Sequence, residues 1–190
     1  MEDRKQELLQ ALEEELKEND MIGEMSLFTA EELNGPSDML RAEVAEFGTT
    51  GQSVLGEFLF LPVDDEELFH FTTVINLTFT LDKAAAEEAA RAISRLNYYL
   101  PIGGFALGGE EDQNLIFKYG IPVLADADIE IQKKTVCAAA DRALLYAERF
   151  EAYLSLILED GVSLEDLFEQ EEQEEQEEQE DQEDQEENAE

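Results

Sequence analysis

The residue types best suited to chemistry are scarce in this chain, which holds one histidine, His70, and one cysteine, Cys137. A histidine-based metal site or a Ser-His-Asp triad would need further partners of other residue types, so a structural or surface role is favoured for His70. A nucleophilic cysteine needs a base or a cation nearby. Lys133 and Lys134 lie about one helical turn before Cys137, but buried packing is the favoured role of this thiol.

Two further segments resemble ligand-binding motifs. Residues 126–130, Asp-Ala-Asp-Ile-Glu, begin like a calcium loop but lack its central glycine and distal glutamate, so capping of a following helix is favoured. The glycine pairs at 103–104 and 108–109 match no phosphate-binding pattern, and the acids at 110–112 would repel a phosphate. The sequence therefore predicts that the protein is not an enzyme and has no catalytic, cofactor-binding or metal-binding residues.

Charge divides the chain into two parts. Residues 171–188 are six acidic triplets without a cation, and residues 169–190 hold fourteen acids and no base. A segment without apolar side chains cannot offset the entropy of ordering itself. We therefore expect residues 169–190 to be a disordered acidic tail and residues 1–168 to form a single domain, in which 1–37 supply an N-terminal helix and linker.

The domain is itself acidic, because the net charge is −37 and the tail leaves −23 on residues 1–168. A polyanionic surface repels phosphate, so we expect no binding to nucleic acid or to an anionic membrane. No apolar run approaches the ~18 residues of a membrane span, and the first residues do not resemble a signal peptide. With a single cysteine, these features indicate a cytoplasmic protein.

Hydrophobic periodicity predicts a helix and three strands in the first half of the chain. A helix is predicted over residues 3–18, with a stripe of four leucines, and a linker follows in which Thr29 and Glu32 form a capping box. Strands are predicted at 39–47, 54–61 and 68–81. The strand at 54–61 is apolar on both faces, which is typical of a central strand. The strand at 68–81 alternates, with phenylalanines on its core face and His70, Val74 and Asn76 on the other.

The second half of the chain predicts two helices around a hairpin. The helices are expected at 83–98 and about 128–158, and the hairpin pairs 105–107 with 115–123. The long helix carries one continuous apolar stripe of seven residues at steps of three and four, namely Val136, Ala140, Ala143, Ala147, Phe150, Leu154 and Ile157. The order α-β-β-β-α-β-β-α predicts an α+β fold with a mostly antiparallel five-stranded sheet packed by helices. The first and last helices are expected to cover the phenylalanine face.

This order of elements resembles the type III secretion chaperone-like fold, and within it the YbjN family of bacterial proteins, described as sensory transduction regulators. The likeness covers about residues 68–157. It rests on the alternating strand, on Ile93-Ser94-Arg95-Leu96-Asn97, on Gly104-Phe105-Ala106-Leu107, and on residues 116–123 with the helix behind them. The acidic tail and the linker after the first helix depart from the family pattern.

The resemblance implies a non-enzymatic regulatory protein that holds an extended segment of a partner protein against hydrophobic patches. It also implies a possible homodimer, with the alanine-rich helix at 83–98 as the candidate interface. From the residues, an excess of apolar side chains near the middle of the sheet indicates a protein-binding surface that includes Phe58, Phe60 and Val74. The alternative is an acidic effector whose polyanionic tail acts on basic proteins or divalent cations.

Overall fold

The computed structural model describes residues 2–48, 51–63, 65–81, 83–108 and 113–157. The predicted acidic tail, 169–190, and the predicted domain boundary at residue 168 lie outside these residues. The helices are α1 (Glu2–Leu16), α2 (Ala30–Leu33), α3 (Lys83–Tyr99) and α4 (Ile129–Ser155). The strands are β1 (Ile22–Phe28), β2 (Met39–Phe47), β3 (Gln52–Leu61), β4 (Leu68–Leu81), β5 (Gly104–Gly108) and β6 (Gln113–Leu124).

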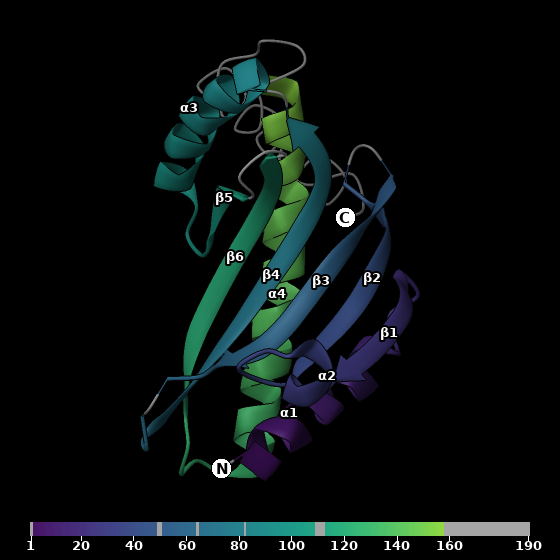
Figure 1. The fold of residues 1–190 in the computed structure, drawn as a ribbon, viewed down its shortest axis with the longest axis vertical. Helices are drawn as coiled ribbons and strands as arrows, with labels where there is room; N and C mark the ends of the chain where they lie inside the picture. Colours follow the sequence, from purple (N-terminus) through teal and green to yellow (C-terminus); the bar gives the residue numbers. More distant parts are fainter. Residues whose placement is uncertain (1, 49–50, 64, 82, 109–112, 158–190) are drawn as a thin grey trace, which may run out of the picture.

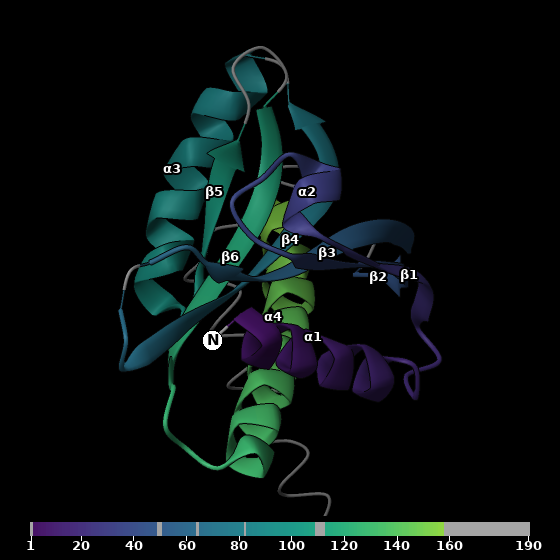
Figure 2. The same ribbon diagram turned by 60° about the horizontal axis from the view of Figure 1, so that its bottom comes forward.

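The described strands form one six-stranded sheet in the order β1-β2-β3-β4-β6-β5, and each neighbouring pair is antiparallel. Helix α4 runs along β4 and β6 on one side of this sheet (Figure 1). Helix α1 packs beside its first half and α3 lies near its second half (Figure 2). The predicted α+β class with an antiparallel sheet is therefore confirmed, and three helices cover the same face.

Helix α1 is held by apolar burial and by one polar link to α4. Its predicted stripe of leucines is at most 2% exposed and packs on the aromatic side chains of β3 and β4. Arg4 donates from Nε to Oε1 of Gln132 at 2.8 Å, and Nε2 of Gln132 donates to the carbonyls of Leu124 and Ala125. The side chain of Gln132 is fully buried. A neutral amide therefore joins α1, α4 and the end of β6 without burying a charge.

Helix α4 connects the two halves of the core. Its first half packs with α1 on Phe58, Phe60, Phe69 and Phe71, while its second half packs with α3 on the other end of the sheet. Six of the seven residues of its predicted stripe are buried, and Ile157 packs against them while partly exposed. The small alanine side chains of this stripe allow the helix backbone to approach the strands closely.

Strand β3 is central, as its apolar sequence predicted, because it lies between β2 and β4. Its two faces differ in burial. Phe58 and Phe60 are 0% and 1% exposed under the helices, whereas Leu55, Leu59 and Leu61 on the other face are half-buried. Phe58 and Phe60 are thus core residues and do not form an accessible surface. Alternate strand residues point to opposite faces, and the helices cover only one of them.

The predicted linker contains an additional strand, so the sheet has six strands where five were expected. Strand β1 pairs with β2 at the edge, with an irregularity between Ile22 and Met25. An edge strand with one neighbour needs little apolar alternation, and its seven residues show none that is regular. The predicted capping box is confirmed, because Glu32 accepts from the Thr29 backbone at 2.8 Å and Thr29 accepts from Glu32 N–H.

The opposite edge is closed by a side chain of α3. The amide of Asn97 donates to the carbonyl of Phe105 at 2.9 Å, and the Phe105 N–H donates to Asn97 Oδ1 at 2.8 Å. Asn97 therefore occupies backbone groups that a further strand would otherwise pair with. Gly103, two residues before Phe105, has a φ of +65°. A Cβ at this position would collide with the Phe117 ring and the Lys118 carbonyl, so the position favours glycine.

The different placement of neighbouring β3 residues predicts different mutational costs. Phe58→Ala should lower the free energy of unfolding by about 3–5 kcal/mol, because it removes a fully buried ring and leaves a cavity. Leu59→Ala should cost about half as much or less, since that side chain already meets solvent. Urea unfolding followed by circular dichroism measures both values. Equal costs would show that the two faces are equally covered.

Thr73 offers a test of the core face of β4. Its side chain is fully buried and its hydroxyl has no hydrogen-bond partner within the described residues. A buried hydroxyl without a partner loses its hydration and gains nothing in return. Thr73→Val should therefore raise the free energy of unfolding by about 1–2 kcal/mol, while Thr73→Ser should lower it. A loss of stability in the valine variant would mean that the hydroxyl is satisfied in solution.

Candidate functional site

The candidate surface lies on the face of the sheet opposite the three large helices. We call this the open face, formed by alternate strand residues that include Arg41, Glu57, Val74 and Lys118, which lie side by side in register. Of the sequence candidates, Val74 is half-buried on this face, whereas Phe58 and Phe60 point to the helices. The three residues therefore do not share one surface.

Apolar side chains are gathered on the open face. The half-buried ones include Met39, Leu55, Leu59, Leu61, Val74 and Ile116. Leu59 pairs directly with Met39 on β2, and Asn76 lies between Leu55 and Ile116 in the sheet register. Sequence analysis found the apolar character of both β3 faces but selected the covered one. Leu55, Leu59 and Leu61 are thus the binding candidates that were missed, although their alternation was visible.

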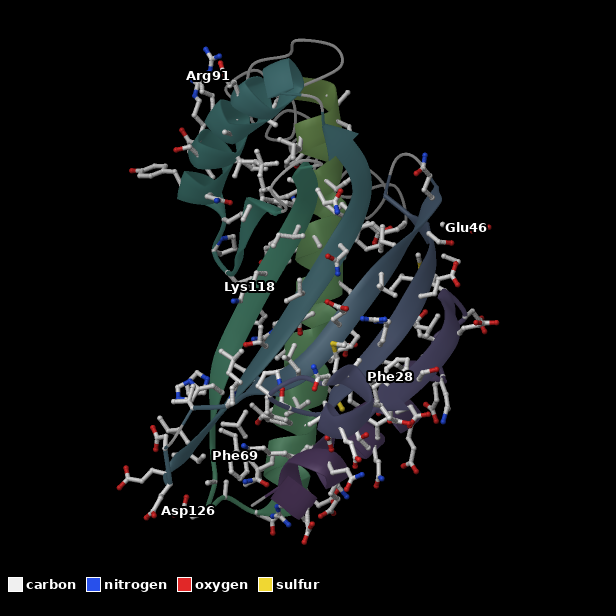
Figure 3. The ribbon with its side chains drawn as sticks, in the orientation of Figure 1. Phe28, Glu46, Phe69, Arg91, Lys118 and Asp126 are labelled. Carbon is white, nitrogen blue, oxygen red and sulfur yellow. The ribbon has the colours of Figure 1, made fainter. Side chains whose placement is uncertain are left out.

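A row of polar contacts, continued by Val74, separates the other apolar residues of this face into two groups. Arg41 Nη2 lies 2.7 Å from Glu57 Oε1, and the Asn76 amide donates to Glu57 Oε2 at 3.3 Å. The Arg41 guanidinium also stacks over Phe28 at 5.4 Å. Phe28 lies toward the β1 edge of the sheet, and Lys118 lies on β6 toward the other edge (Figure 3). The Arg41–Glu57 pair is partly exposed and contributes at most about 1 kcal/mol, so its main effect is to place a neutral polar pair between apolar groups.

The open face continues into a hollow at one end of the sheet. This hollow has a volume of about 480 Å³ and is lined by residues of β2, β3, β4 and β6, including Glu43, Leu55 and Asn76. It combines an apolar wall with a carboxylate and an amide. Such a lining can receive an apolar side chain next to a polar group, as peptide-binding sites do.

The residues singled out for chemistry are placed apart from one another. His70 lies half-exposed on the open face, with Nε2 3.9 Å from Asp65 Oδ2. Asp128 caps α4 by accepting from the Glu130 N–H at 2.9 Å, which confirms the capping interpretation. Within the described ranges, no group of three or more histidine, cysteine, aspartate or glutamate side chains is arranged to hold a metal ion.

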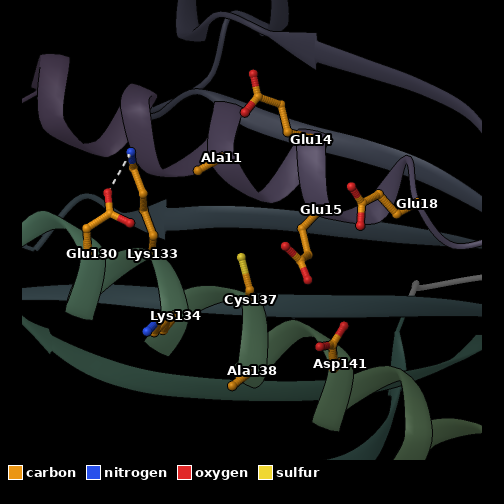
Figure 4. A pocket seen from close by; sticks show the side chains of 10 residues that line it. All are labelled: Ala11, Glu14, Glu15, Glu18, Glu130, Lys133, Lys134, Cys137, Ala138 and Asp141. Carbon is orange, nitrogen blue, oxygen red and sulfur yellow. Dashed lines mark hydrogen bonds and ion pairs between the residues drawn. The ribbon is translucent and has the colours of Figure 1, made fainter.

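Cys137 lies in an acidic groove of about 600 Å³ between α1 and α4 (Figure 4). Burial, together with the nearby carboxylates of Glu15 and Asp141, raises the pKa of this thiol to about 11. Lys133 does not oppose this effect, because its ammonium group contacts Glu130 at 3.3 Å and Glu7 at 3.5 Å. Burial also raises the pKa of Asp141. The thiol is therefore protonated at neutral pH and unsuited to nucleophilic attack.

Comparison with known proteins finds no family model, no curated protein and no solved structure that matches this chain. Among the described helices, none is both long and apolar enough to cross a membrane. The functional argument therefore rests on the geometry of the open face and on the chemistry of the residues around it.

The environment of Cys137 predicts slow alkylation. Since only the thiolate reacts, iodoacetamide should modify the native protein far more slowly at pH 8 than the urea-unfolded chain, with the rate rising toward pH 11. Asp141→Asn should lower the pKa and increase the rate, because a negative neighbour no longer opposes the thiolate. Mass spectrometry of the alkylated protein measures both effects. Native and unfolded chains reacting equally fast at pH 8 would contradict the burial of this thiol.

Proposed function

We propose that this protein is a non-enzymatic regulatory module that captures a segment of a partner protein on the open face of its sheet. The observation that carries this proposal is the set of half-buried apolar side chains on that face, including Leu55, Leu59 and Val74. One-sided sheets are common in antiparallel folds, but their solvent face is usually polar. Apolar side chains gathered on such a face are typical of interaction sites.

The division of the open face favours an extended segment as the bound form. Leu59 lies on one side of the Arg41–Glu57 pair and Leu55 on the other, while Val74 continues the row of the pair, and the hollow next to Leu55 lies at one end. An extended chain places alternate side chains toward one surface about every 7 Å, so it can contact both apolar groups and cross the polar row between them. The polar row would then set the register of the bound segment, since a mismatched apolar side chain would desolvate the ion pair.

The family that we propose is consistent with this binding role. We propose a type III secretion chaperone-like fold and membership of the YbjN family of bacterial sensory transduction regulators. Its support is the order of the elements and the residues of the resemblance, among which Asn97 has a structural role at the edge of β5. A non-enzymatic role is also supported by the protonated thiol of Cys137 and by its distance in the fold from His70, which lies on the other side of the sheet.

Paired substitutions test the binding surface. The double variant Leu59→Glu/Val74→Glu should lose partner capture by at least about tenfold, because it places two carboxylates in an apolar contact. Val63→Glu is the matched control, since Val63 is 47% exposed in the loop after β3. Capture from lysate of the source cell, with the retained protein identified by mass spectrometry, compares the variants after urea unfolding has shown that they fold.

A truncation after residue 168 tests the acidic-effector alternative in the same assay. A discrete protein retained by both the full chain and the truncated chain at moderate salt supports capture by the sheet. Binding that requires residues 169–190 and disappears at moderate salt indicates a polyanion effect. Capture that survives in the folded double variant would remove the open face as the binding site.

A further inference from the structure

The hollow on the open face contains a carboxylate that has no partner among the described residues. Glu43 lines this hollow and is exposed, and it forms no hydrogen bond or ion pair with another described residue. The neighbouring pair on this face differs, because Arg41 and Glu57 neutralise each other at 2.7 Å. The described lining of the hollow includes no basic residue. Its negative charge is therefore available to a bound cation.

The irregular pairing of β1 with β2 leaves this carboxylate open on one side. The register shifts between Ile22 and Met25, so that Gly23 and Glu24 both oppose Glu43. Such a bulge changes the direction in which nearby side chains point. A Cβ on Gly23 would stand 3.8 Å from Oε2 of Glu43, so any larger side chain at this position would cover the carboxylate. Strand β1 thus lies beside Glu43 without shielding it.

The rest of the hollow supplies an apolar wall and a neutral acceptor. In the sheet register, Leu55 lies between Glu43 and Asn76. Asn76 Nδ2 donates to the Leu55 carbonyl at 3.5 Å and to Glu57 Oε2 at 3.3 Å. The Oδ1 atom of Asn76 accepts no hydrogen bond from a described residue. A carboxylate, an aliphatic surface and an amide oxygen therefore lie on three neighbouring strands.

These three features suit the side chain of arginine. Its aliphatic stem packs on apolar surface while its charged end stays in contact with water. The guanidinium is always charged and carries five N–H donors, which can reach a carboxylate and a second oxygen acceptor together. The open face already holds one arginine in this manner, because Arg41 contacts Glu57 and lies over the Phe28 ring at 5.4 Å.

We propose that the hollow binds an arginine side chain of the partner segment that the open face captures. This inference rests on the proposed function and names the chemistry of the partner. Leu59 and Leu55 are four residues apart on β3, or about 13 Å, and Glu57 lies midway between them. An extended segment that follows β3 therefore carries an apolar residue over Leu59, a small polar residue over the Arg41–Glu57 pair and an arginine in the hollow, at steps of two residues.

The charge of the protein favours such a partner over other occupants. Residues 1–168 carry a charge of −23, which attracts a basic segment and speeds its association. A second copy of the chain is disfavoured, because each copy carries −37. A divalent cation is also disfavoured. Among the described residues, no three histidine, cysteine, aspartate or glutamate side chains are grouped to hold a metal ion.

Titration with defined peptides tests the inference. The probe is the acetylated and amidated pentapeptide Leu-Thr-Ser-Thr-Arg, and the peptide of reversed order is titrated beside it because the face does not fix a direction. Each is added at millimolar concentrations to isotope-labelled full-length protein, and NMR shifts of open-face amides give the Kd. Matched peptides carry citrulline, which has a similar shape without the charge, or norleucine in place of arginine. The arginine peptide should bind at least about fivefold more tightly than the citrulline peptide, as expected for a partly exposed ion pair.

Two variants with the same change of charge locate the contact. Glu43→Gln should reduce the preference for arginine over citrulline to about twofold or less, because only the overall charge of the protein then remains. Glu14→Gln removes an equal charge from an exposed position of α1, on the helix side of the sheet, and should leave the preference unchanged. Both positions are exposed, so both variants should keep the amide spectrum of the folded chain.

The contrary outcomes are distinct from one another. Equal binding of the arginine and citrulline peptides, or tighter binding of the norleucine peptide, would assign the hollow to a neutral side chain and overturn the inference. A preference that persists in Glu43→Gln would assign it to the overall charge and overturn it as well, as would the absence of binding by any of these peptides. Capture by the open face is decided separately by the Leu59→Glu/Val74→Glu variant, so the failure of one proposal is distinguishable from the failure of the other.

Discussion

The contact of α4 with β4 and β6 is the constraint on which the rest of the structure depends. Both core clusters meet on this one helix, with α1 completing the first and α3 completing the second. The small side chains of Ala140, Ala143 and Ala147 are fully buried and let the helix lie close to the strands. Because all three large helices share this layer, the other face of the sheet carries only the short helix α2 among the described helices (Figure 2).

Charge shapes what each surface of this layer can bind. The polar connection between α1 and α4 joins the partly exposed Arg4 to the fully buried, neutral side chain of Gln132, in a protein of net charge −37. Carboxylates gather around Cys137 on one side of α4, Arg142 lines the groove on the other side, and Lys134 lines both grooves. Overall repulsion between acidic copies of the chain makes such local departures from the average the places where contacts can form.

Much of the fold follows from local patterns that survive in the folded chain. The bounds of β2 and β4 coincide with their alternating segments, and α4 begins at the predicted Asp128 cap. Strand β1 could not be found in this way. Its edge position is stabilised by backbone pairing with β2, and backbone hydrogen bonds carry no sequence signal. Part of the candidate site was also beyond sequence reasoning, because an apolar strand does not show which of its faces the helices will cover.

The sequence by itself determined the order of the elements other than β1, the antiparallel class, the apolar stripes and the scarcity of catalytic residue types, since these depend on composition and on periods of two and 3.6 residues. Tertiary structure decided that Phe58 and Phe60 are core while Leu59 and Val74 meet solvent. It also decided that β6 extends beyond its pairing with β5, so that Lys134 and Arg142 line a groove beside the end of β6. The physical reason is that burial and pairing depend on which elements meet in space, and no local pattern encodes that choice.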